Sequence, residues 1–296
     1  MNKITDYFKA LPQYLLPHHP LSRAIGLLVR CRVPWFKNLL IDGFRRLYNV
    51  DLSLAAESDP HAYPDFNAFF TRALRPDARP LPAAEEAVVS PVDGRVSQAG
   101  IMTDGRLLQA KGRDYSLTQL LGSVELADRF QGGNYATIYL SPRDYHRIHM
   151  PLRGRLRKMV HIPGRLFSVS PATARVIPDL FARNERVVCL FETEAGPMAM
   201  VLVGAIFVAS IETVWAGVVT PPAGKRITQW EYEQDAPELE RGAEMGRFNM
   251  GSTVILLFGP GGVEWCPACH PEAVVRMGQQ IGICQRSTVS CCDESR

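Results

Sequence analysis

Apolar residues are patterned differently in the two parts of this chain. In the first 50 residues they form short groups that Pro17, Pro20 and Pro34 interrupt, with basic residues between them. This spacing predicts short amphipathic helices. From about residue 85 the apolar runs become strand-like, and Gly-containing turn signals separate them. The expected strands are 88–89, 135–140, 187–192, 198–211, 214–219 and 253–258. The segregation of helices from strands predicts an α+β fold, with N-terminal amphipathic helices followed by a β-rich domain of mainly antiparallel sheets.

Three regions follow from this pattern. We expect a helical membrane-association region over 1–84, a β-rich catalytic domain over 85–284 and a flexible tail over 285–296. With 296 residues and 46% hydrophobic content, the chain can bury one large core, with room for a second subdomain. The longest apolar run, 198–211, is too short to cross a bilayer. The seven cysteines show no regular disulfide spacing, so we expect reduced thiols.

The basic charge is concentrated at one end. Residues 1–50 contain eight Lys or Arg against Asp6 and Asp42, a net charge of +6, whereas the whole chain carries only +3. Basic helices that also carry aromatic residues can lie in the interface of an anionic bilayer. Packing of their apolar faces on the core is the alternative. Nucleic acid is a poorer explanation, because no binding motif accompanies the charge and the rest of the chain is mildly acidic.

The tripeptide Gly251-Ser252-Thr253 opens a β-branched run near the C-terminus. The Ser252 hydroxyl could attack the carbonyl of Gly251, since glycine offers no side chain to block it and tolerates the strained backbone required. The N-to-O acyl shift would give an ester, β-elimination a dehydroalanine, and loss of ammonia a pyruvoyl group in place of Ser252. An ordinary junction between a loop and a strand would have the same three residues.

Two histidines could supply the base that self-cleavage needs. Ser141, Pro142 and Asp144 resemble an N-cap, a first-turn proline and a capping acid, which predicts a short helix over about 142–149. His146 and His149 would then share one face. Histidine is a general base near neutral pH, but packed or exposed histidines, or a zinc pair without an obvious third ligand, would fit the same spacing.

Several longer motifs flank these residues and carry a resemblance. They are DFNAFFTR at 65–72, RPDARP at 75–80, SPVDG at 90–94, YHRIHMP at 145–151, ETVWAG at 212–217 and EMGRFNMGSTVILLF at 244–258. Together, and in this order, they closely resemble the phosphatidylserine decarboxylase proenzymes over roughly residues 1–284. The resemblance implies a lyase that converts phosphatidylserine to phosphatidylethanolamine and CO2.

The resemblance also implies roles for particular residues. Asp93, His149 and Ser252 would form a charge-relay set for cleavage between Gly251 and Ser252. The Ser252-derived pyruvoyl group would be the covalent cofactor and form a Schiff base with the substrate amine, with no pyridoxal phosphate and no metal. His146 is our candidate donor of the proton to the product carbon.

The expected mature protein is a chain 1–251 held noncovalently to a chain 252–296, and this pair could form a homodimer. We expect it to bind phosphatidylserine in an anionic membrane, peripherally at the cytoplasmic face of the inner membrane, and to bind no nucleic acid.

Other functional classes fit some of the same residues. A serine hydrolase would keep Ser252 intact, but the Gly-x-Ser-x-Gly motif is missing. A noncatalytic lipoyl- or biotinyl-like β-sandwich would need a lysine where Ala199 stands. Cys266, Cys269 and His270 fit a haem-attachment pattern or half a zinc site. Lys111 or Lys225 could hold pyridoxal phosphate, although no phosphate-binding glycine loop accompanies either lysine.

Overall fold

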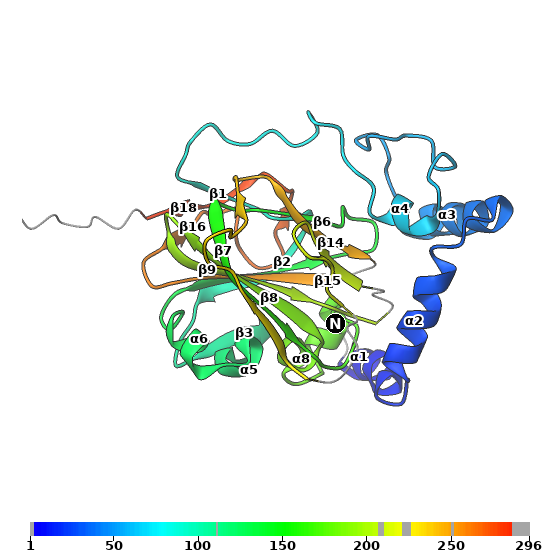
Figure 1. The fold of residues 1–296 in the computed structure, drawn as a ribbon. Coiled ribbons are helices and arrows are strands. Elements are labelled where there is room, and N and C mark those ends of the chain that lie inside the picture. Colours follow the sequence, from blue (N-terminus) through cyan, green and yellow to red (C-terminus); the bar gives the residue numbers. More distant parts are fainter. Residues whose placement is uncertain (1–2, 111, 207–209, 221–225, 250–251, 286–296) are drawn as a thin grey trace, which may run out of the picture.

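A helical arm lies along one end of a β-rich body in the computed structural model, which describes residues 3–110, 112–206, 210–220, 226–249 and 252–285 (Figure 1). The strand pairs of all its sheets are antiparallel, so the predicted α+β fold is confirmed. The helices are α1 (Lys3–Ala10), the 3-10 helix η1 (Leu11–Tyr14), α2 (His18–Leu28), α3 (Pro34–Tyr48), α4 (Phe66–Phe70), α5 (Leu117–Leu121), α6 (Val124–Asp128), α7 (Pro171–Ala174) and α8 (Leu180–Arg183).

The body is organised around one large sheet. Among the described residues its strand order is β12-β7-β8-β9-β15-β5-β2-β17, and β13 pairs with β7. Its strands are β2 (Gly94–Ile101), β5 (Asn134–Leu140), β7 (Gly154–Ile162), β8 (Arg186–Thr193), β9 (Gly196–Val203), β12 (Thr228–Glu231), β13 (Glu238–Leu239), β15 (Ser252–Phe258) and β17 (Val274–Val275). The strand that begins at Ser252 therefore lies inside the sheet, between β9 and β5.

In the described part of the chain, three smaller sheets accompany the large one. One has the order β11-β10-β14-β6, the second β1-β18-β16, and the third is the hairpin β3-β4. Their strands are β1 (Ala87–Val89), β3 (Arg106–Ala110), β4 (Arg113–Ser116), β6 (Arg147–His149), β10 (Ser210–Thr213), β11 (Gly217–Val218), β14 (Glu244–Asn249), β16 (Val263–Trp265) and β18 (Gln280–Cys284).

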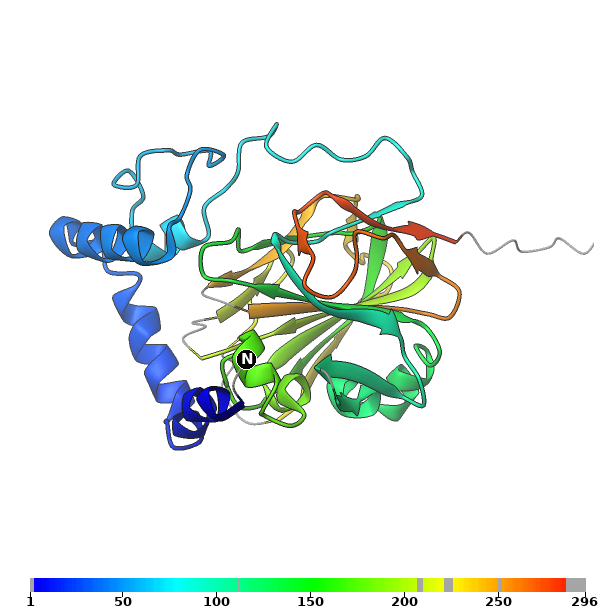
Figure 2. The same ribbon diagram turned by 180° about the vertical axis from the view of Figure 1, so that it is seen from behind.

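Both faces of the large sheet are covered. Alternate residues of a strand face opposite sides, and β15 shows it clearly: Val254 and Leu256 join a core shared with β6, β10, β14 and β18, whereas Ile255 and Leu257 join a second core with α5 to α8. Figures 1 and 2 show these layers on opposite sides of the sheet. This burial explains why 254–258 is a continuous apolar run.

The N-terminal helices have a small core of their own, to which Ile41, Phe66 and Phe69 contribute. Helix α3 begins with a proline and ends at Asn49 in the left-handed conformation, as expected for helix termini. Arg175 after α7 binds Asp6 of α1 with two hydrogen bonds of 2.8 and 3.0 Å. None of the described helices is long and apolar enough to span a bilayer.

Two sequence predictions were wrong. The segment expected to form a helix over 142–149 makes one turn and then becomes β6. Ser141 and Asp144 do bond to each other, at 2.7 and 2.9 Å, but His146 O accepts from Phe248 N and β6 pairs with β14, so tertiary pairing overrides the capping signal. The run 198–211 is not one strand: β9 ends at Val203, and β10 belongs to another sheet.

Other strand predictions differ in extent. Of the run 214–219, only Gly217–Val218 is a strand, β11, because a turn precedes it. The runs at 88–89, 135–140, 187–192 and 253–258 coincide with β1, β5, β8 and β15. The expected tail, apart from Gln285, lies outside the described residues, as do Gly251, Lys111 and Lys225.

Candidate active site

Ser252 is the first residue of β15 and pairs with Leu140 at the end of β5. Its side chain is fully buried, and its Oγ has no hydrogen-bond partner in the described part of the chain. Ser252 lines a pocket of about 400 Å³, to which Leu16 and Tyr48 of the N-terminal region and Tyr139 of β5 also contribute. A buried hydroxyl without a partner is costly. This atom is therefore a candidate for chemistry, although the Gly251 carbonyl lies outside the described residues.

His146 lies close in structure to the beginning of β15. Its Nε2 is 3.1 Å from the carbonyl oxygen of Ser141, and Ser141 directly follows the register partner of Ser252. Phe70 of α4 stacks on the imidazole with ring centroids 4.1 Å apart. Burial, reinforced by the nearby charge of Arg72, lowers the pKa of His146 to about 3. The free protein therefore holds a neutral imidazole at this position.

His149 is fixed by hydrogen bonds at both ring nitrogens. Nδ1 is 2.8 Å from the Gly242 carbonyl oxygen and Nε2 is 2.9 Å from the Tyr145 hydroxyl. Because a carbonyl can only accept, Nδ1 carries the proton, and in the neutral ring Nε2 accepts from Tyr145. Burial lowers the pKa of His149, while the Gly242 carbonyl opposes the shift. Nε2 is thus the basic nitrogen of this histidine.

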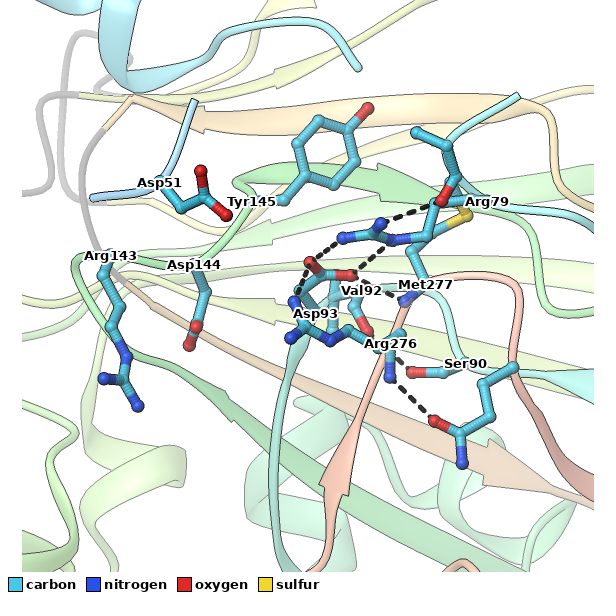
Figure 3. Close-up of polar contacts among 12 residues, drawn as sticks. Asp51, Arg79, Ser90, Val92, Asp93, Arg143, Asp144, Tyr145, Arg276 and Met277 are labelled. Atoms are coloured by element: carbon cyan, nitrogen blue, oxygen red, sulfur yellow. Dashed lines mark hydrogen bonds and ion pairs between the residues drawn. The ribbon is translucent and has the colours of Figure 1, made fainter. Parts of the chain in front are cut away.

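Asp93 immediately precedes β2 and lies among cationic side chains (Figure 3). Arg79 donates to both carboxylate oxygens, from Nε at 3.2 Å and from Nη2. Met277 N donates to Oδ1 at 2.8 Å, and Arg276 Nη1 lies 3.5 Å from Oδ2. Two of these partners belong to the C-terminal 45 residues, so Asp93 links the two segments that cleavage after Gly251 would separate.

The structure brings the predicted site residues together in two pairs, His149 with Asp93 and His146 with Ser252. His149 N donates to Pro91 O at 2.9 Å, which ties it to the loop that carries Asp93. His146 and Ser252 are connected through Ser141 and Leu140, as described above. Among the described residues, no hydrogen bond joins Asp93 to His149 or either histidine to Ser252. The complete charge-relay set therefore remains a prediction.

Sequence reasoning did not assign roles to several residues of this region. Tyr145 orients His149, Phe70 covers His146, and Arg79 holds Asp93. Asn249, which precedes the cleavage segment, bonds to Asn67 of α4 at 3.0 Å and to Ser210. These residues lie within or beside the quoted motifs, but only their three-dimensional contacts indicate what they do.

Comparisons with known proteins bear on this site. A family model described as phosphatidylserine decarboxylase matches residues 66–283, and a shorter one described as PSD matches residues 8–49. The phosphatidylserine decarboxylase proenzyme of Azotobacter vinelandii is 59% identical over 281 residues, which cover 94% of this chain and 98% of the relative. The chain belongs to the phosphatidylserine decarboxylase family.

Further members of the family agree. The proenzyme of Ectopseudomonas mendocina is 57% identical, with 93% of this chain and 97% of the relative covered. That of Alkalilimnicola ehrlichii is 61% identical, with 85% and 88% covered. The matched residues 66–283 include Asp93, both histidines and Ser252.

The cysteine motif at 266–270 shares no hydrogen bond with Asp93, His146, His149 or Ser252 among the described residues. Cys266 and Cys269 are free, and burial raises the pKa of Cys269 to about 12, which disfavours its thiolate. His270 is exposed, and its Nδ1 lies 2.9 Å from Pro271 O. Within the described ranges, no three His, Cys, Asp or Glu side chains are grouped so that they could hold a metal ion.

The buried histidines predict a loss of stability in mild acid. The pKa of His146 is about 3 in the folded protein against 6.5 for the unperturbed group. Between pH 3 and pH 6.5 the unfolded chain binds a proton at His146 and the folded protein does not. The stability that the neutral imidazole contributes is therefore fully present above about pH 6.5 and is lost as the pH falls toward 3. We expect His146→Gln to reduce the dependence of the unfolding free energy on pH, by up to about 1.4 kcal/mol per pH unit.

Urea denaturation between pH 7 and pH 5 measures this slope. His149 and His18 have pKa values shifted in the same direction, so the slope should decrease without vanishing. His270→Gln, a change at an exposed position, serves as the control and should leave the slope unchanged. Equal slopes in the wild type and His146→Gln would contradict the assignment.

Proposed function

We propose that this chain is a self-processing, pyruvoyl-dependent decarboxylase that converts phosphatidylserine to phosphatidylethanolamine and CO2. The observation that carries the proposal is the buried, unpartnered Ser252 Oγ at the first position of a central strand, beside a pocket that the N-terminal helices help to line. Membership of the family supports the substrate and the reaction.

The first step of the proposal is attack of Ser252 Oγ on the carbonyl carbon of Gly251. His149 Nε2, assisted by Asp93, would take the hydroxyl proton. In the structure His149 Nε2 is bonded to the Tyr145 hydroxyl, so His149 must release Tyr145 before it can bond to Ser252. Asp93 is bonded to Arg79, so it must release an arginine before it can bond to the imidazole of His149. The resulting ester then breaks by β-elimination, which frees a chain 1–251, and water releases ammonia from the new N-terminus of a chain 252–296.

Residue 252 is a suitable place for the resulting pyruvoyl group. It lines a pocket through which substrate and water can reach it, and neighbouring strands hold β15 on both sides through the pairs Thr253–Val203 and Ser252–Leu140. The group supplies an electron-withdrawing ketone that can take up the electron pair left when CO2 departs. The same strand pairing would keep the two chains together after the bond is cut.

His146 is proposed to give the proton that replaces CO2. A neutral imidazole with a pKa near 3 must first gain that proton, and a negatively charged substrate beside it would raise its pKa. Phe70 stacking and the Ser141 carbonyl fix the ring plane. The pocket volume of about 400 Å³ is in the range of small-molecule sites, so it suits a head group, with the acyl chains outside it.

Denaturing intact-mass spectrometry, combined with CO2 release from phosphatidylserine, tests this function. We expect two species divided between Gly251 and Ser252, the shorter with a ketone in place of its amine. A single full-length species that hydrolyses esters would favour the serine hydrolase instead. A single species with neither activity would leave the noncatalytic β-sandwich as the better explanation.

We further propose that residues 1–84 associate with the anionic cytoplasmic surface of the inner membrane. Large apolar side chains on the N-terminal helices are exposed, and the same region is basic. Examples are Phe8 at 74%, Leu27 at 78% and Leu47 at 74% exposure. Exposed apolar surface beside positive charge is typical of peripheral membrane binding.

Replacing apolar residues of α3 should weaken vesicle binding. Trp35, Leu39 and Leu47 are 64 to 74% exposed, so changing all three to Ser should not disturb the core. Each large apolar side chain buried contributes about 1.5–3 kcal/mol, so we expect at least a roughly tenfold loss of partitioning into vesicles with anionic lipid, measured by co-sedimentation. The control is Ile101→Ser with Val124→Ser, two equally exposed positions of the body. Unchanged partitioning of the α3 variant would contradict the proposal.

A further inference from the structure

Arg72, two residues after α4, is a buried cation that lies over the Phe69 ring, 5.9 Å from its centroid, and forms no salt bridge with the described residues, although the aspartates of its pocket act on its charge. It is 5% exposed, its Nη2 donates to the carbonyl oxygens of Arg143 and Asp144 at 3.0 and 3.4 Å, and its Nη1 has no hydrogen-bond partner within the described ranges. No carboxylate of the described residues forms a salt bridge with it. Burial lowers the pKa of Arg72, yet arginine keeps its proton in proteins. A buried charge of this kind is costly unless an anion binds it.

Arg72 lines a pocket of about 310 Å³ that is distinct from the Ser252 pocket. The lining contains four arginines and three aspartates, a net charge of +1: Arg72, Arg79, Arg143, Arg276, Asp51, Asp93 and Asp144. Arg79 and Arg276 both bind Asp93, as Figure 3 shows. Asp51 accepts hydrogen bonds from Ser53, and Asp144 accepts one from Ser141 N. The lining groups therefore leave positive charge in excess.

Arg143 supplies a second cation to this pocket. Its side chain is exposed, and in the described part of the chain its guanidinium takes part in no hydrogen bond or salt bridge, although its charge acts on Asp144. Arg143 follows Pro142, which lines the Ser252 pocket, so the two pockets lie on either side of one turn. An anion held here would be adjacent to the proposed reaction site.

We propose that this pocket binds one oxyanion of the phosphate class, held by the unpartnered Nη1 of Arg72 and the outer charge of Arg143. Nη1 can donate to a phosphate oxygen while Nη2 keeps its two carbonyl bonds, and the net charge of +1 matches a phosphodiester. The bound oxyanion is either the phosphodiester of a lipid head group or free phosphate. The first assignment rests on the proposed function, and the second does not.

Thermal unfolding of the purified full-length protein tests the site. Inorganic phosphate and glycerophosphoserine, a soluble phosphodiester, are each compared with chloride at equal ionic strength. A ligand at ten times its Kd stabilises the folded protein by RT ln 11, so we expect a rise in Tm of roughly 3 °C. A shift with glycerophosphoserine alone assigns the pocket to the lipid head group, and a shift with inorganic phosphate assigns it to phosphate in general. No shift with either compound overturns the proposal.

Variants locate the effect within the pocket. Arg143→Gln changes an exposed side chain and should fold normally, yet lose most of the shift. Arg72→Lys keeps the charge, but one ammonium cannot both keep the two carbonyl bonds and reach the anion, so it should lose the shift as well. Arg129→Gln, an exposed arginine at the end of α6, is the control and should retain the full shift. A full shift in Arg143→Gln would overturn the proposal even if Arg72→Lys fails to fold. Chain cleavage and CO2 release, measured separately, show whether the proposed function holds.

Discussion

Ser252→Ala leaves the chain uncut and abolishes decarboxylation. Alanine has no hydroxyl to attack Gly251, and no ketone can form at position 252 without that attack. Because Ser252 is fully buried and its Oγ makes no hydrogen bond with the described residues, removing this oxygen should not destabilise β15. Intact-mass spectrometry should therefore find one folded species near 33.0 kDa, and CO2 release should fall to the uncatalysed rate.

Thr253→Val is the matched control for this result. Thr253 is the next residue of β15, is fully buried, and its Oγ1 likewise makes no hydrogen bond within the described part of the protein. Valine keeps the β-branched shape, so this variant should still be cut and remain active. Cleavage of Ser252→Ala at the normal position would show that another group attacks, and failure of both variants would point to strand packing as the cause.

His149→Ala accumulates uncut precursor, whereas His146→Ala is cut but turns over slowly. A positioned general base or acid typically contributes 10²–10⁴-fold, so we expect cleavage of the first variant, and kcat of the second, to fall by roughly that factor. The time course of precursor loss on denaturing gels measures the first effect. CO2 release by the processed protein measures the second. An uncut His146→Ala protein would mean that the histidine roles are reversed.

Tyr145→Phe separates the chemistry of His149 from its packing. This change removes only the hydroxyl that bonds Nε2 at 2.9 Å, while the Gly242 contact at Nδ1 remains. If Nε2 must leave Tyr145 to reach Ser252, the variant should be processed at least as fast as the wild type. Much slower cleavage would indicate that Tyr145 itself takes part in the reaction.

Asp93→Asn should also accumulate precursor, but its interpretation needs a stability measurement. Asp93 is bonded to Arg79, Arg276 and Met277 N, so the change removes a charge from between two cations as well as a relay group. Slow cleavage with an unchanged Tm would support the relay. Slow cleavage with a much lower Tm would favour a structural role, in which Asp93 holds the C-terminal segment on the body.

Some elements were recognised from local pattern and others were not. Residues 187–191 and 254–258 are buried on both faces of the sheet, so these stretches are continuously apolar and easily recognised, whereas Glu192 at the end of the first run is exposed. Strands β2 and β7 have several half-buried or polar positions, and neither was predicted. The helix expected at 142–149 was wrong because pairing of β6 with β14 outweighs a capping signal that extends over only one turn.

The sequence by itself determined the α+β class, the Gly251–Ser252 junction, the family motifs and the basic, apolar N-terminal region, because these depend on residue type and on neighbours in the chain. Only the tertiary structure decided which distant residues meet. The register of β15 with β5 places Ser252 beside the turn that carries His146, and the folding of α4 against that turn buries Arg72. Such contacts depend on long-range strand pairing and on shared burial, and neither leaves a periodic signal in the sequence.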